Sequence, residues 1–275
     1  MQPALQVRRV VREHSGWLEW VARAGYATRG FLYLIIGIMA ALTAFGRGGE
    51  TTDSKGALSE LYHQPFGQAL LLLAAIGLFG YAAFSAYQAV LAPERHARGW
   101  SGVAKRIGRG FVALLHVSLG AYALHLMQGG QREPTDAHHG TAQLLSWSPP
   151  LGQFLVGVAG AAIVGFALQQ LTCAWRSKLD EQLDLGALAG STRRLAIRAS
   201  RIGIAARAIV FLVAGGFLIK AAVTADPDRA KSFGESLGAL RETPVGEPLL
   251  AAVALGLMAF AAYEFIEARY RRIAH

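Results

Sequence analysis

Charged residues, cysteines and prolines are all scarce in this sequence. Asp, Glu, Lys and Arg make up 16% of its 275 residues, against about 25% in an ordinary soluble domain. The single cysteine, Cys173, cannot form a disulfide within the chain, which excludes a disulfide-stapled scaffold. Only nine prolines occur and 53% of the residues are hydrophobic, which is atypical of a disordered chain or a soluble enzyme. The composition favours a protein with several membrane-spanning segments.

Long apolar runs occur six times, and each is long enough to cross about 30 Å of hydrocarbon as a helix. None shows the alternation of polar and apolar residues that is typical of a strand. Helices also satisfy their backbone hydrogen bonds internally, as lipid-exposed spans must. We therefore expect six transmembrane helices, at Ala24–Phe45, Pro65–Leu91, Arg106–Met127, Pro150–Trp175, Ile202–Ala225 and Val245–Arg269. The first run is too long for a cleaved signal peptide and predicts a retained signal-anchor helix.

Positive charge is distributed unevenly between the two sides of the predicted membrane. If the N-terminus is cytoplasmic, the cytoplasmic ends and loops hold 20 of the 27 Lys and Arg residues. Cytoplasmic loops collect such residues, so we expect both termini in the cytoplasm and the protein in a bacterial inner membrane. The net charge of +9 then reflects topology and contact of the basic loops with anionic lipids. No nucleic-acid partner is expected.

A threefold internal repeat organises the chain. An Arg-x-Gly element begins each odd-numbered span, a further glycine follows twelve residues later, and a Pro-x-Gly element begins each even-numbered span after a Leu-rich loop. Such a fixed pattern marks a repeated structural unit, here two membrane helices. The expected divisions are a basic cytoplasmic N-terminal segment (1–22), repeat 1 (23–92), repeat 2 (93–176), a cytoplasmic linker (177–200), repeat 3 (201–270) and a cytoplasmic tail (271–275).

The three units all enter and leave the membrane on the same side. Units of equal orientation are related by an axis along the membrane normal, so the predicted fold is all-α, with three helical hairpins around a pseudo-threefold axis. Small residues let membrane helices approach closely. We therefore expect the repeated glycines to pack helices together: Gly25, Gly37, Gly108, Gly120, Gly203 and Gly215.

Polar side chains recur on equivalent helix faces, toward the cytoplasmic third of the predicted bundle. Ionisable residues inside a membrane are costly and are commonly functional. Arg207 and Glu264 lie in one hairpin at similar depth, so an ion pair between them is expected. A purely structural role, in which the charges lock helices together near the interface, is the alternative. The candidate polar intramembrane site comprises Arg29, Arg207, Glu264, Glu267, Gln88, Gln170 and, near mid-membrane, His116.

Repeat 1 begins with the element Arg23-Ala-Gly25-Tyr26-Ala-Thr-Arg29-Gly30. With the Leu-rich loop and Pro-x-Gly, this element resembles a bacterial integral membrane family catalogued as a domain of unknown function, number twelve hundred and six. The resemblance covers about residues 21–270. It implies six spans in three repeats, and it implies no activity or catalytic residue. Repeat 2 departs from the pattern, with Val112 where repeats 1 and 3 have Arg29 and Arg207.

The remaining motifs indicate neither a cofactor nor a catalytic centre. The histidines of the outer segments, His63, His125, His138 and His139, lack the spacing of a metal site. No nucleophile elbow, zinc-protease signature or kinase motif occurs. Two functions stay open. One is a channel or transporter-like protein whose polar cytoplasmic vestibule receives a small solute or ion. The other is a non-transporting membrane scaffold or accessory subunit that binds a protein partner or lipid.

Overall fold

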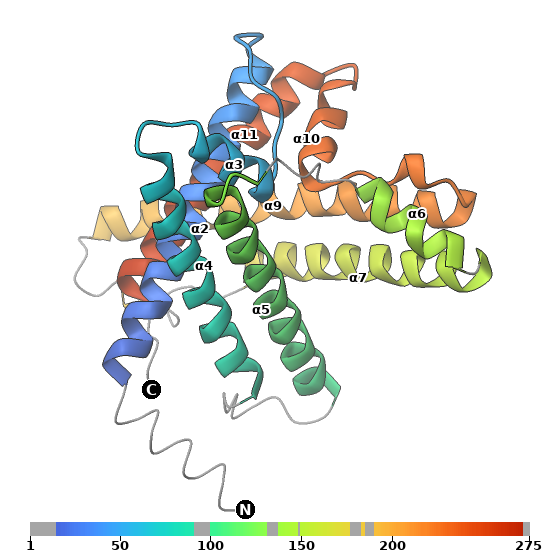
Figure 1. The fold of residues 1–275 in the computed structure, drawn as a ribbon. Helices are drawn as coiled ribbons and strands as arrows, with labels where there is room; N and C mark the ends of the chain where they lie inside the picture. Colours follow the sequence, from blue (N-terminus) through green and yellow to red (C-terminus); the bar gives the residue numbers. More distant parts are fainter. Residues whose placement is uncertain are drawn as a thin grey trace, which may run out of the picture.

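The computed structural model describes residues 15–90, 100–130, 137–147, 149–176, 183–184 and 190–271, and this part of the chain is all-α (Figure 1). Six of its helices are long and apolar enough to cross a membrane, which confirms the predicted fold class. They are α2 (Ser15–Ala44), α4 (Gly67–Val90), α5 (Trp100–Met127), α7 (Pro149–Arg176), α9 (Gly190–Thr224) and α11 (Gly246–Tyr270).

The expected linker between repeats 2 and 3 is partly helical. Helix α9 begins at Gly190, well before the expected start of the fifth span at Ile202. Residues 177–182 and 185–189 of the linker lie outside the described residues, as do the basic segment before Ser15 and the tail after Arg271.

Short helices occupy the segments that the sequence marks as Leu-rich loops. They are α3 (Ser54–Tyr62), α6 (Ala137–Trp147) and α10 (Phe233–Arg241), the last preceded by a 3-10 turn, η1 (Pro227–Arg229). Asp53 caps α3 through its side chain, and Ser232 and Glu235 form a reciprocal capping box on α10. Leu58 and Leu237 are fully buried, so each of these helices presents an apolar face to the bundle. Capping residues before an apolar helical pattern explain why the loops are helical.

A tight turn joins α3 to α4 and α10 to α11, and α6 ends two residues before α7 begins. The glycine of Pro-x-Gly stands where the two helices approach most closely. A Cβ atom at any of these glycines would collide with a backbone carbonyl of the preceding segment, for Gly67 with Tyr62, for Gly152 with Leu144 and for Gly246 with Arg241. The repeated Pro-x-Gly element is therefore a requirement of the turn.

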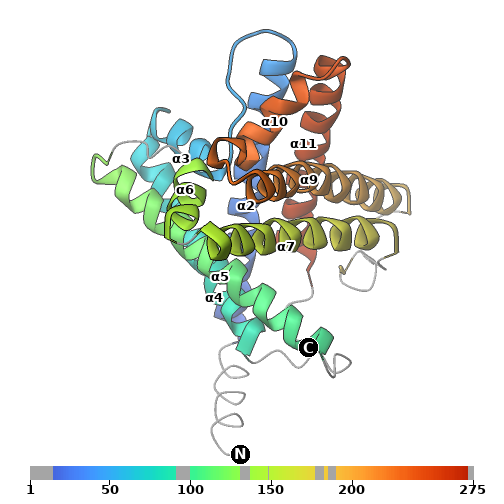
Figure 2. The ribbon, with the colours of Figure 1, turned by 90° about the vertical axis from the view of Figure 1, so that its right-hand side faces the viewer.

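The long helices form three close pairs, and each pair joins helices from neighbouring repeats. Helix α11 packs along α2, α4 along α5, and α7 along α9. The pairs run in clearly different directions and cross one another (Figures 1 and 2). Within repeats 1 and 3, α2 also packs on α4 and α9 on α11, whereas α5 and α7 of repeat 2, both described throughout, do not pack along each other. Two hairpins are therefore closed and one is open.

The three pairs share one register. The second repeated glycine of α2, of α5 and of α9 lies against the partner helix. The residue that it meets there stands two positions before an aromatic residue, which is Phe260, Tyr81 or Phe166, respectively. A Cβ atom there would come within 2.8 to 2.9 Å of a side-chain atom: Gly37 against Met258, Gly120 against Phe79 and Gly215 against Val164. Glycine allows this close approach. The pseudo-threefold symmetry thus extends to single residues.

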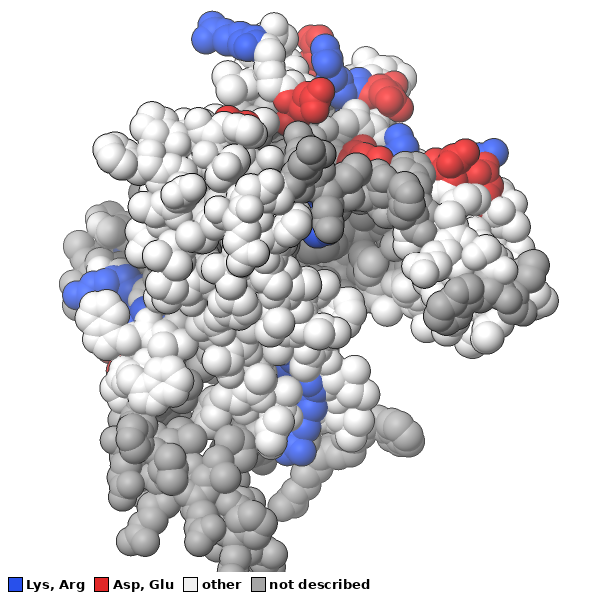
Figure 3. Space-filling view, in the orientation of Figure 1, with Lys and Arg blue, Asp and Glu red and all other residues white. Residues whose placement is uncertain are grey.

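Apolar side chains fill the bundle between the pairs. Leu32, Ile36, Leu71, Leu78 and Leu257 are at most 2% exposed and belong to one contiguous core. On the face seen in Figure 3, acidic side chains gather at the upper end, basic side chains form a few separate groups, and uncharged surface covers most of the middle. An uncharged surface of this kind is suited to contact with lipid, the environment that the six apolar helices require.

Candidate polar site within the helix bundle

The charged residues predicted for the site are withdrawn from the surface. Glu264 is 1% exposed, Glu267 is 3% exposed and Arg207 is 7% exposed. The Arg29 side chain is 12% exposed. Charges placed in this way are costly unless each has a partner, so the partners define what the site is.

Glu264 forms an ion pair with Arg29, with 2.8 Å between Oε1 and Nη2. The predicted ion pair between Glu264 and Arg207 is therefore wrong, because the described contacts pair Glu264 with Arg29 instead. The observed partners come from α11 and α2, because the close helix pairs form between neighbouring repeats and not within one hairpin. The ion pair therefore joins the last repeat to the first.

Both arginines lie over an aromatic ring of their own hairpin. The Cζ atom of Arg29 is 4.4 Å from the ring centroid of Tyr81, and that of Arg207 is 4.5 Å from the centroid of Phe260. The two rings occupy equivalent positions in repeats 1 and 3. A cation held over a ring in this way gains about 0.5–2 kcal/mol, depending on desolvation. The two arginines thus share one local geometry.

Aromatic rings surround Arg207 on its other sides as well. Its Cζ atom lies 5.4 Å from the centroid of Phe211, 5.7 Å from that of Tyr33 and 5.8 Å from that of Phe166. Among the described residues no carboxylate forms an ion pair with it, and its Nε atom has no hydrogen-bond partner there. Arg207 is therefore a buried cation that contacts ring faces, and Glu264 acts on it electrostatically beyond ion-pair distance.

Glu267 is paired with Arg271, one helical turn further along α11. The Cζ atom of Arg271 lies 5.1 Å from the ring centroid of Tyr26 on α2. Burial by itself would lower the pKa of Arg271, but the Glu267 carboxylate raises that pKa above its ordinary value, so the guanidinium keeps its charge. Sequence reasoning missed Arg271, although a spacing of four residues from Glu267 is a usual signal of a helical ion pair.

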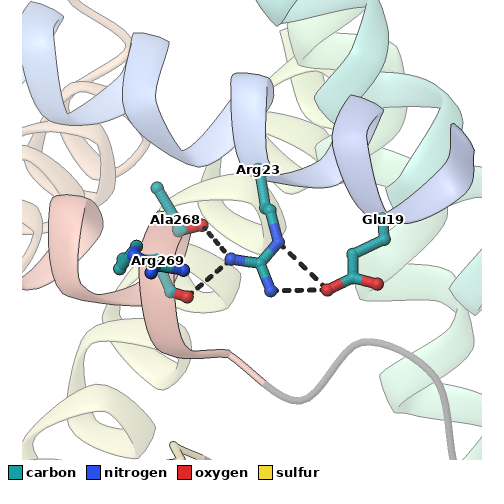
Figure 4. A network of polar contacts seen from close by, with 4 residues as sticks. All are labelled: Glu19, Arg23, Ala268 and Arg269. Carbon is teal, nitrogen blue, oxygen red and sulfur yellow. Dashed lines mark hydrogen bonds and ion pairs between the residues drawn. The ribbon is translucent and has the colours of Figure 1, made fainter. Parts of the chain in front are cut away.

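Arg23 joins the beginning of α2 to the end of α11 (Figure 4). Its guanidinium donates to the carbonyl oxygens of Ala268, at 3.2 Å, and Arg269, at 2.5 Å, and its Nε donates to Glu19 at 3.1 Å. The last carbonyls of a helix have no donors within the helix, so Arg23 supplies them from outside. The equivalent Arg201 of repeat 3 is exposed, and the cap is a feature of the α2–α11 pair.

Several buried polar atoms of α2, α4 and α11 retain unused hydrogen-bonding capacity. Both carboxylate oxygens of Glu264, which meet Arg29 as an ion pair only, have no hydrogen-bond partner in the described part of the chain. The same holds for the Tyr26 hydroxyl, the Ser85 hydroxyl and Gln88 Oε1. Buried polar groups are nearly always satisfied by protein, water or a ligand. The site can therefore accept polar atoms from outside the chain.

His116 and Gln170 lie at the margin of the site, and both are half-buried. The Nδ1 atom of His116 donates to the carbonyl oxygen of Val112 at 2.7 Å, and its ring centroid lies 4.6 Å from that of Tyr81. His116 therefore touches the ring that carries Arg29. Gln170 stands on α7, which packs along α9, the helix that carries Arg207.

The first repeated glycine distinguishes repeat 2 from the others. Gly25 lies against the backbone of Tyr81 and Gly203 against the backbone of Phe260, so neither position accepts a side chain. Gly108 instead has open space where its side chain would be. The structure gives Gly108 no packing role, in contrast to the expectation, because α5 and α7 diverge.

A cavity of about 270 Å³ lies at the other end of α2. Met39, Glu50, Thr52, Gly56, Ser59, Glu60 and His63 line it. These residues come from α2, α3 and the connection between them, so the cavity is separate from the polar site around Glu264.

Comparison with known proteins identifies the family. The family described as Domain of Unknown Function (DUF1206) matches residues 24–92, 107–177 and 202–271, which coincide with the three hairpins. A protein of Bacillus subtilis (strain 168) described as "Uncharacterized protein YxxB" is 32% identical over 269 residues, which cover 96% of this chain and 95% of that protein. No solved structure matches the chain. The chain belongs to the DUF1206 family, as its repeated elements predict.

Proposed function

We propose that this member of the DUF1206 family binds a small polar solute or ion at the buried site around Glu264, as a channel or transporter-like membrane protein. The supporting observation is the unused hydrogen-bonding capacity of Glu264 in a buried ion pair, together with that of Ser85 and Gln88 on α4, the helix whose Tyr81 ring lies under Arg29. Charged and polar groups inside membrane proteins are commonly found on solute and ion pathways. A protein that served only as a scaffold would need no such open capacity at its centre.

All of these side chains belong to helices that are long and apolar enough to cross a membrane, which supports a site inside the bilayer. We extend the proposal to the inner membrane of a bacterium, with both termini cytoplasmic and anionic lipids at the basic loops. The uneven distribution of Lys and Arg supports this orientation. A fluorescent reporter that folds only in the cytoplasm, fused to the C-terminus, tests this orientation. A fusion protein of normal abundance without fluorescence would show that the C-terminus lies on the other side.

Water access to the site tests the main proposal. In a Cys173→Ser background, Ser85→Cys places a nearly isosteric thiol beside the polar groups, at a position that is fully buried. A small, charged thiol reagent added to the protein in nanodiscs should label this cysteine, because a solute site must open to water. Ala75→Cys on the same helix is the matched control, since Ala75 lies in the apolar core.

Labelling of the cysteine at position 85 but not of that at position 75 would support a wet vestibule. Equal resistance of both thiols, in protein whose thermal unfolding matches that of the parent, would contradict a solute pathway through this site. Equal labelling of both cysteines would indicate a loosened bundle and would also contradict a water-filled site specific to the surroundings of position 85.

A further inference from the structure

The α7–α9 pair has the register of the α2–α11 pair at the second repeated glycine. Gly37 of α2 meets Met258 and Ala254 of α11, and Gly215 of α9 meets Val164 and Gly160 of α7 at the corresponding positions. This shared register fixes which residues face each other one turn further along. The place that Arg29 and Glu264 occupy in the first pair belongs to Arg207 and Gln170 in the second.

One charge is therefore missing from the second pair. Arg29 has the Glu264 carboxylate as its counter-ion at 2.8 Å. Arg207 has the neutral amide of Gln170 at the equivalent register position. Arg207 is 7% exposed, and its Nε atom lacks a hydrogen-bond partner among the described residues. A buried guanidinium in this state has strong affinity for an anion with planar oxygens.

The open hairpin of repeat 2 leads to this arginine from the side. Gly108 and Val112, on α5, replace the close glycine contact and the arginine of the other repeats. Across the gap, Phe166 of α7 is 38% exposed and lies 5.8 Å from Arg207. The molecular surface is recessed between the column that contains α5 and the arm formed by α7 and α9 (Figure 3). The two closed hairpins offer no such approach.

We propose that Arg207 and Gln170 bind the carboxylate of an amphiphile whose alkyl chain lies between α5 and α7. This inference rests on the proposed solute-binding function and names the class of ligand. The carboxylate takes the place that Glu264 fills in the equivalent pair, accepting hydrogen bonds from Arg207 and from the amide of Gln170. The exposed ring of Phe166, 5.8 Å from Arg207, suits an alkyl chain that arrives from the bilayer.

Binding of radiolabelled decanoate to the full-length protein in nanodiscs tests this inference, with empty nanodiscs subtracted. Gln170→Glu supplies an internal carboxylate to Arg207 and should weaken decanoate binding by about tenfold or more, because the ligand must displace an ion pair. Arg207→Gln should weaken binding to a similar degree. Arg201→Gln removes an arginine from the exposed face of the same helix and should leave binding unchanged.

Two competitors define the chemistry. Unlabelled decanoate should displace the probe, whereas decanol, which has the chain without the charge, and acetate, which has the charge without the chain, should each require at least about a hundredfold higher concentration. Displacement by acetate at the same concentration as decanoate would contradict the proposal that the ligand needs an alkyl chain. Displacement by decanol at that concentration would contradict the proposal that the site recognises a carboxylate.

Decanoate binding that Gln170→Glu and Arg207→Gln both leave intact would overturn the site. The proposed function fails separately: if the cysteine at position 85 is labelled by the charged reagent while wild-type protein binds no decanoate, a polar vestibule stands and this ligand does not.

Discussion

The α2–α11 and α7–α9 pairs have the same backbone register and different chemistry. In both, a repeated glycine brings the helices together and an arginine lies 4.4 to 4.5 Å above an aromatic ring. In the first pair the arginine has a carboxylate partner and the helix end is capped by Arg23. In the second pair the carboxylate is replaced by Gln170 and the capping arginine is exposed.

The comparison shows that the helix packing and the charged partners of the arginines vary independently between the repeats. The glycine contacts reproduce the helix approach in each unit, so single substitutions elsewhere can change charge without changing the backbone. In the first pair, the charged side chains join α2 to α11. The second retains a cation next to the open hairpin, and this is where we propose that a ligand binds.

Removal of Glu264 should produce the largest effect on this comparison. Glu264→Gln leaves Arg29 buried without a counter-ion, and breaking such a pair costs about 3–5 kcal/mol. We expect a marked loss of stability in thermal or denaturant unfolding of the detergent-solubilised protein.

A double-mutant cycle assigns that loss to its cause. Arg29→Gln added to Glu264→Gln should restore part of the stability, because the unpaired charge is gone, whereas Arg207→Gln added to Glu264→Gln should restore none. Equal rescue by the two arginine substitutions would contradict the ion pair seen in the structure.

The first repeated glycine provides a matched pair of steric substitutions. Gly25→Leu drives a side chain into the backbone of Tyr81, and overpacking of this kind costs about 1–3 kcal/mol or more. Gly108→Leu enters open space and should change the unfolding free energy by less than about 0.5 kcal/mol. Comparable destabilisation by the two substitutions would show that α5 and α7 close on each other in the membrane.

Gln170→Glu should make the second pair resemble the first. A carboxylate opposite Arg207 should add a charge-assisted contact of about 1 kcal/mol, which corresponds to a rise in the unfolding temperature of roughly 2–4 °C. The neighbouring Gln169 is exposed, so Gln169→Glu is the control and should give no rise. A fall in the unfolding temperature for Gln170→Glu would remove the register argument.

The smallest expected effect distinguishes the helix ends. Arg23→Ala removes the donors to the carbonyls of Ala268 and Arg269 and should cost about 1 kcal/mol. Arg201→Ala, at the exposed equivalent position, should stay within about 0.5 kcal/mol of the parent. Differential scanning calorimetry of the two variants side by side checks the ordering, which equal losses would contradict.

Much of the architecture could be predicted from repeated residues. Six apolar runs gave the number of spans, and the spacing of Arg-x-Gly and Pro-x-Gly gave three units, since both depend on local sequence and on the thickness of a bilayer. The charged residues at 29, 207, 264 and 267 were also found from the sequence, because buried ionisable residues are rare in apolar helices.

The pairing of those charges could not be found in the same way. The sequence suggested Arg207 as the partner of Glu264 because both belong to one hairpin. The structure assigns Arg29 instead, since the closest helix contacts cross between repeats. The aromatic rings around Arg207 were missed for the same reason, because three of them come from other helices. Arg271, in contrast, lies four residues from Glu267 and could have been found from that spacing.

The sequence alone determined that this chain forms membrane-spanning helices in three related units, because hydrophobic length and glycine spacing act locally along each helix. Only the tertiary structure decided that repeat 2 is open and that Arg207 forms no ion pair with a carboxylate of the described residues. Both depend on which faces meet after the helices pack. Close packing selects one register among several that local sequence would allow.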